Sequence, residues 1–229
     1  MHSSDPDAAP INPLPAAVIV LALPMVLVEL ALLAGAEGLV GGPAAVGWRI
    51  GILERWAFVP ALFDWMVETG RWGVPDLARF VTYPFVHLGF LHMVMVLVFL
   101  MALGKLVGEV MGNAAVFAMF FVSAIAGALV LGLVTESPRP LAGGYPAVYG
   151  LIGGYTFVLR ARLIAEGGPQ TRAFSLIGML LFIQLVFGAL FGTGPDWIAE
   201  IAGFAAGFGL SFLIVPGGWA RVLGWLRNR

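Results

Sequence analysis

The chain has 229 residues, of which 60% are hydrophobic and only 11% are charged, and its formal net charge is −1. Soluble domains are about half apolar and about a quarter charged, so this composition excludes a soluble domain and indicates an integral membrane protein. The small net charge supplies no basic field for nucleic acid, and the lack of cysteine excludes disulfides, thiol catalysis and thiolate metal sites.

Six apolar runs approach the length of about 20 residues that crosses the hydrocarbon core of a bilayer. Charged residues gather between these runs, and the 31 glycines allow helices to approach one another closely. We therefore expect an all-α membrane protein with six transmembrane helices. The runs lie at 16–36, 84–107, 114–134, 145–163, 173–192 and 197–215.

The same pattern divides the chain into a disordered cytoplasmic tail (1–15), a membrane domain (16–215) and a basic cytoplasmic tail (216–229). Arginines close to the spans mark the cytoplasmic side of a membrane protein. They cluster between the fourth and fifth runs and after the sixth, so we expect both termini in the cytoplasm. These arginines are Arg160, Arg162, Arg172, Arg221, Arg227 and Arg229.

The first loop, roughly 37–83, is too long for a simple connection and is rich in tryptophan and arginine. Both residue types suit the headgroup zone, where an amphipathic helix over Ile52 to Met66 would bury its aromatic face. The tryptophans Trp56, Trp65 and Trp72 of this loop are candidate partner-binding residues. An ordinary aromatic belt at the membrane surface is the alternative interpretation.

Two histidines, His87 and His92, lie in an otherwise apolar segment, where a polar ring needs a partner. Their spacing of five residues places them about 140° apart on a helix, which disfavours a shared zinc ion. We expect His87 to hydrogen-bond a loop carbonyl and to hold the long loop against the helix. Glu29 in the first run is expected to form an interhelical hydrogen bond as a protonated carboxyl.

Three stretches carry a resemblance to a known family: Arg79-Phe80-Val81-Thr82 with His87 and His92, then Gly143-Gly144-Tyr145-Pro146, then Ala199-Glu200 with Gly203 and Gly207. In this order they resemble the rhomboid intramembrane serine proteases. The resemblance implies a six-helix bundle with a hydrated cavity on the non-cytoplasmic side. It also implies that the first loop, with its Trp48-Arg49 pair, is a membrane-associated hairpin of helices.

The resemblance also shows which catalytic positions have changed. His92 falls on the second histidine of the pattern, but Val96 stands where the family has an oxyanion-binding asparagine. Tyr145 takes the place of the serine nucleophile, followed by Pro146 in place of a glycine, and Glu200 takes the place of the histidine base. A tyrosine without an adjacent base is a poor acyl acceptor, and proline offers no amide proton.

Glu200 allows two interpretations. A buried glutamate favours its neutral form and would donate to His92 or accept from Tyr145, which predicts that these three residues converge in one polar cluster. Alternatively, Thr193 to Asp196 form a capping box, and Glu200 is hydrated near the surface. Gly203 and Gly207 have the small-xxx-small spacing that packs the last helix against the fourth. The remaining membrane serines, Ser123, Ser175 and Ser211, are expected to serve packing.

These residues predict a rhomboid-like pseudoprotease of the bacterial inner membrane, with no cofactor and no metal. Inactive relatives in the family bind transmembrane clients, so the expected function is to bind a membrane protein or complex and affect its assembly or stability. The alternative is a hydrolase or protease with an altered site that uses Glu200 and His92. A small-solute transporter is disfavoured, because the spans show no paired breaks.

Overall fold

The structure, a computed structural model, describes residues 13–192 and 194–215. The predicted basic tail (216–229), most of the predicted disordered tail (1–15) and Thr193 of the predicted capping box lie outside the described residues. The orientation of the termini and the division into tails and membrane domain therefore stay predictions from the sequence.

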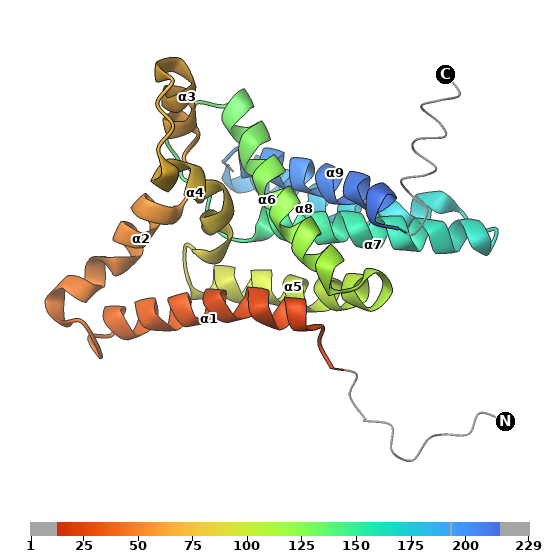
Figure 1. Cartoon of the computed structure of the whole chain (residues 1–229), viewed down its shortest axis with the longest axis horizontal. Helices are drawn as coiled ribbons and strands as arrows, with labels where there is room; N and C mark the ends of the chain where they lie inside the picture. Colours follow the sequence, from red (N-terminus) through yellow and green to blue (C-terminus); the bar gives the residue numbers. More distant parts are fainter. Residues whose placement is uncertain (1–12, 193, 216–229) are drawn as a thin grey trace, which may run out of the picture.

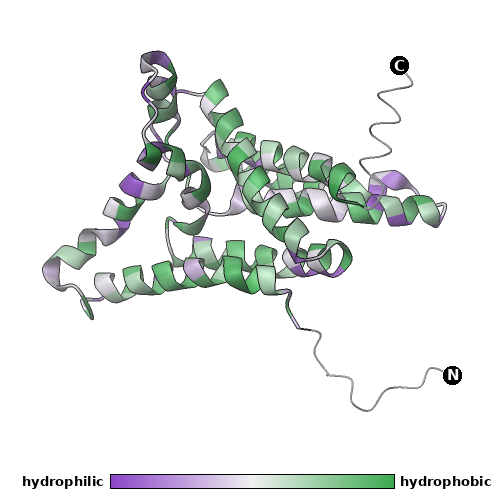
Figure 2. Cartoon of the chain, viewed as in Figure 1, coloured by the Kyte–Doolittle hydropathy of each residue, from purple (hydrophilic) through white to green (hydrophobic). Residues whose placement is uncertain are grey.

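Six helices in the described part are long and apolar enough to cross a membrane, which confirms the predicted all-α, six-span architecture. They are α1 (Ala16–Ala36), α5 (Phe90–Met111), α6 (Asn113–Val134), α7 (Tyr145–Ala165), α8 (Ser175–Phe191) and α9 (Asp196–Ile214). The first loop holds three shorter helices: α2 (Trp48–Trp56), α3 (Pro60–Thr69) and α4 (Val74–Thr82). Hydrophilic residues gather in this loop and at the ends of the long helices (Figure 2).

The long helices form two groups, which are joined by α6 and by a direct contact between α5 and α7 (Figure 1). On one side α1 lies along α5, and the side chain of Asn113 accepts a hydrogen bond from the Ala17 amide, 3.1 Å away, which caps the start of α1. On the other side α9 packs against α7 and α6. α7 is the central helix, and its residues 146–154 are buried without interruption. A helix segment that is buried on all sides belongs to the core of a bundle.

The contact between α7 and α9 depends on glycine. A Cβ atom on Gly203 would overlap the carbonyl oxygen of Pro146, and one on Gly207 would overlap that of Gly150. The two backbones thus touch where the sequence predicts small-xxx-small packing, because α9 has no side chain at these two positions.

The second span starts later than predicted. The chain forms a short 3-10 helix, η2 (Tyr83–Phe85), and α5 begins only at Phe90. Pro84 has no amide proton, and Gly89 is extended (φ 178°, ψ 172°), so a helix cannot run from 84 into α5. His87 therefore precedes the helix, and the predicted 140° separation from His92 is wrong.

The predicted amphipathic helix over Ile52 to Met66 is also wrong. It is divided into α2 and α3, because Ala57 to Val59 are extended and Pro60 starts a new helix. Phe58 exchanges two backbone hydrogen bonds with Leu141, at 3.1 and 2.7 Å, which joins the loop to the segment before α7. Its ring is buried beside Phe80, with centroids 4.8 Å apart, so this part of the loop packs into the core.

Replacing Gly207 by alanine should destabilise the protein by about 1–3 kcal/mol, because the new methyl group would press α9 away from Gly150. Gly209 lies on the same helix with open space around it, so Gly209→Ala is the matched control and should change stability by less than about 0.5 kcal/mol. Unfolding in mixed detergent micelles measures both variants. An equal response of the two would contradict the packing role of Gly207.

Candidate functional site

A cavity of about 270 Å³ lies where the first turns of α5, α7 and α9 meet the segment before α7. His92 comes from α5, Tyr145 from α7, and Asp196 and Glu200 from α9. The other lining residues are Leu88, Pro140, Leu141, Ala142 and Pro146. The three positions predicted to converge, His92, Tyr145 and Glu200, thus line one cavity.

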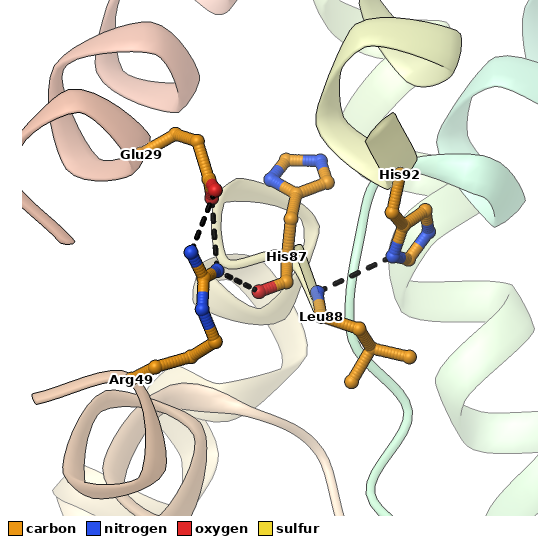
Figure 3. Close-up of polar contacts among 5 residues, drawn as sticks. All are labelled: Glu29, Arg49, His87, Leu88 and His92. Carbon is orange, nitrogen blue, oxygen red and sulfur yellow. Dashed lines mark hydrogen bonds and ion pairs between the residues drawn. The ribbon is translucent and has the colours of Figure 1, made fainter. Parts of the chain in front are cut away.

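His92 is held in a defined orientation. Its Nδ1 atom accepts a hydrogen bond from the Leu88 amide at 3.3 Å (Figure 3), so the proton of a neutral imidazole is on Nε2. The ring stacks on Tyr145 with centroids 5.1 Å and planes 18° apart. Gly143 has φ +91°, and a Cβ atom there would lie 2.7 Å from His92 Nε2. His92 is therefore packed between a tyrosine ring and a glycine backbone.

The residues around Tyr145 do not form a nucleophile site. Tyr145 begins α7 and Pro146 is its second residue, so one backbone amide proton is missing from this helix start. Val96 is fully buried, and a Cβ atom on Gly144 would lie 2.8 Å from its Cγ1. An apolar methyl group thus packs against Gly144, from the position where the family pattern has a hydrogen-bond donor.

Glu200 is 7% exposed and lies one turn inside α9, so it is not a hydrated surface residue. Its Oε2 accepts a short hydrogen bond from the amide of Gln184 on α8, and its carboxyl also interacts with the Tyr149 hydroxyl. These partners differ from the predicted ones, His92 and Tyr145. Gln184 lies in an apolar run, and no pattern in that part of the sequence predicts its contact with Glu200 on α9.

Glu29 forms an ion pair instead of the predicted protonated hydrogen bond. Arg49 Nη1 and Nη2 donate to its two carboxylate oxygens at 3.0 and 2.7 Å, and Nη1 also donates to the His87 carbonyl at 2.9 Å (Figure 3). Arg49 thereby joins α1, the first loop and the segment before α5. The Trp48-Arg49 pair and the lone acidic residue of the first span are the sequence signals for this contact.

His87 joins this network through its carbonyl, so the prediction that its ring bonds a loop carbonyl is wrong. The ring is buried, and its Nε2 has no hydrogen-bond partner among the described residues. Burial, followed by the neighbouring His92 and the Arg49 charge, lowers the pKa of His87 to about 3. The ring packs edge-on to His92, with centroids 5.3 Å apart.

The three membrane serines lie away from the cavity. Ser123 is fully buried against Gly150, the Ser211 hydroxyl donates to the Gly207 carbonyl at 2.8 Å, and Ser175 is exposed at the start of α8. Within 13–192 and 194–215, no group of three or more histidine or acidic side chains is placed to hold a metal ion.

Replacing Arg49 by methionine should destabilise the protein by about 3–5 kcal/mol, because the Glu29 carboxylate would stay buried without its cation. The double variant Glu29→Gln with Arg49→Met should lose less, since the unpaired charge is gone. Arg162→Met is the control: it breaks an exposed, solvent-screened ion pair with Glu166 and should change stability far less than Arg49→Met does. Equal losses for Arg49→Met and Arg162→Met would contradict this role.

Stability should fall as the pH drops below about 6.5, the ordinary pKa of histidine, because the unfolded chain then takes up a proton at His87 that the folded chain refuses until pH about 3. At pH 5 this group alone should cost about 1–2 kcal/mol. Thermal unfolding of the protein and of His87→Gln between pH 7.5 and 5 tests this. The variant should lose less stability over that range, and parallel curves would contradict the burial of a neutral His87.

Comparison with known proteins agrees with this geometry. Residues 75–217 match the Rhomboid domain family. The chain is also similar to RHOMBOID-like protein 5 of Arabidopsis thaliana, with 28% identity over 183 residues, or 78% of this chain and 53% of the plant protein. It thus spans about half the length of that curated relative. Because the family match covers more than half of its length, the chain belongs to the rhomboid family.

Proposed function

We propose that this rhomboid does not cleave proteins, and that it binds a transmembrane segment of a client membrane protein and affects the assembly or stability of that client. The proposal rests on which residues stand at the two catalytic positions and on the contacts that they make. Tyr145 and Glu200 replace the nucleophile and the base, and each is engaged in contacts that serve neither role.

The contacts explain why an acyl-transfer reaction is unfavourable here. Tyr145 stacks on His92 face to face, so the His92 ring does not accept its phenolic proton in this arrangement. Val96 and Pro146 remove two donors that would stabilise an oxyanion, and loss of a single donor costs about 3 kcal/mol of transition-state stabilisation. The serines lie outside the cavity and cannot substitute for the nucleophile.

α8 offers a surface for a client helix. It is bound to the rest of the bundle by few contacts, and most of its described side chains are exposed. Lipid tails also cover apolar side chains, so apolarity alone does not select a protein partner. Gln184 supports a protein client, because it joins this exposed helix to Glu200 at the cavity. The exposed apolar residues of α8 are Met179, Phe182, Ile183, Leu185, Val186, Phe187 and Leu190.

The second candidate is a hydrolase in which Glu200 activates water and His92 donates to the developing oxyanion. The shared cavity and the Nε2 proton of His92 favour it. The hydrogen bonds from Gln184 and Tyr149 oppose it, because they occupy the carboxyl oxygens that a general base would use.

We predict no protease activity from the purified protein. It should neither cleave a generic transmembrane rhomboid substrate nor react with a serine-directed fluorophosphonate probe. Labelling that disappears in Ser123→Ala, Ser175→Ala or Ser211→Ala would contradict this prediction. Cleavage that is lost in Glu200→Gln but retained in those three variants would establish the alternative hydrolase.

Photo-cross-linking in native membranes tests client binding. Probes at Phe182 and Leu185 of α8, and at Trp56, Trp65 and Trp72 of the loop, should capture one dominant membrane protein. Probes at Ile19 and Leu23 are the control, because these side chains are also more than half exposed, on α1. The same smear of abundant proteins from α8, the loop and α1 would contradict a dedicated client.

A further inference from the structure

We infer that the client segment carries a lysine or arginine within the membrane, and that this basic side chain enters the cavity and pairs with Glu200. The inference rests on the proposed function and specifies the chemistry of the partner. It starts from a difference between two glutamates, Glu29 and Glu200, that are buried in transmembrane helices: their partners differ in charge.

Glu29 and Glu200 are 1% and 7% exposed, and both lie in transmembrane helices. Glu29 has the guanidinium of Arg49 on both of its oxygens. Glu200 has no lysine or arginine within ion-pair distance in the part of the chain that the structure describes, and its partners Gln184 and Tyr149 are uncharged. A carboxylate buried in a bilayer is stabilised best by an opposite charge, and among the described residues Glu29 has one on both oxygens whereas Glu200 has only uncharged partners.

The cavity beside Glu200 has room for such a charge. Its volume of about 270 Å³ accommodates several water molecules or the end of a long side chain. Asp196, one turn earlier on α9, lines the same cavity and adds a second carboxyl. The positive end of α9 stabilises Asp196 in the first turn, as does the nearby Arg139, but that effect fades before Glu200.

The other groups around the cavity agree with a cationic occupant. His92 is neutral in the tautomer described above, so it brings no competing positive charge. The Tyr145 hydroxyl can accept a hydrogen bond from an ammonium or guanidinium group.

Gln184 is the hydrogen-bond partner of Glu200 when no client is bound. Its amide bridges α8 to Glu200, while α8 otherwise has few contacts with the bundle. The ammonium group of a client lysine adds a charge–charge attraction that the neutral Gln184 amide lacks, so it would displace that amide from the carboxylate. The exposed apolar side chains of α8 would then pack against the client helix.

The probes for this inference are synthetic leucine-alanine transmembrane peptides with a single lysine in the outer half, compared with the same peptides with leucine there. Energy transfer in phosphatidylcholine nanodiscs measures their affinity. The protein should bind the lysine peptide at least about tenfold more tightly, a modest requirement for a charge-assisted contact. Glu200→Gln should abolish this preference. Glu166→Gln, which removes the same charge from an exposed carboxyl paired with Arg162, should retain it.

Equal binding of the two peptides by the wild type, or an unchanged preference in Glu200→Gln, would overturn the inference. If Glu200→Gln fails to fold, Gln184→Leu decides: it removes the competing partner and should raise the affinity for the lysine peptide, and no rise would overturn the inference. A client captured from α8 without a basic residue in its membrane segment would refute this inference and leave the proposed function intact. A lysine preference without any captured client would contradict the proposed function alone.

Discussion

The close approach of α7 and α9 is the constraint on which the rest of the site depends. Gly203 and Gly207 place the α9 backbone directly against the carbonyls of Pro146 and Gly150. Glu200 precedes Gly203 by one turn, so this crossing also fixes its carboxyl near Tyr149 and beside the cavity. Any side chain at the crossing would separate the helices and displace Glu200. The packing of the family and the changed chemistry of this member are therefore coupled, because Glu200, Gly203 and Gly207 lie on one face of α9, at i, i+3 and i+7.

A second constraint comes from the bilayer, which provides no water to buried polar groups. At Glu29 the chain satisfies this constraint with Arg49 from the first loop, which donates hydrogen bonds to the Glu29 carboxylate and also to the carbonyl of His87. One side chain thereby fixes three segments that are distant in sequence, including the one that leads into α5. The orientation of His92 follows from this, since the Leu88 amide that holds its Nδ1 directly follows His87.

The sequence predicts the parts of this structure that depend on local patterns. Run lengths give the six spans, and the glycine spacing gives the α7–α9 contact. Local patterns do not predict contacts between segments that are distant in sequence. Arg49 and Gln184, which bond Glu29 and Glu200, come from segments with no periodic relation to these partners. The late start of α5 is different, because Pro84 and Gly89 are visible in the sequence and both oppose a helix that runs from 84 into α5. The burial of Phe58 followed from its pairing with Leu141, which no pattern within the loop indicates.

The replacements in the site act together. A tyrosine in the serine position brings a ring that stacks on His92, and a valine in the asparagine position fills the space under the helix start. Both changes add packing where a protease needs mobile protons and free donors. The glutamate in the base position adds a buried carboxyl whose partners within residues 13–192 and 194–215, Gln184 and Tyr149, are uncharged. The stacked ring at the nucleophile position and this carboxyl without a cation agree better with the proposed binding of a client than with catalysis, and they are the basis for the basic side chain that we propose in that client.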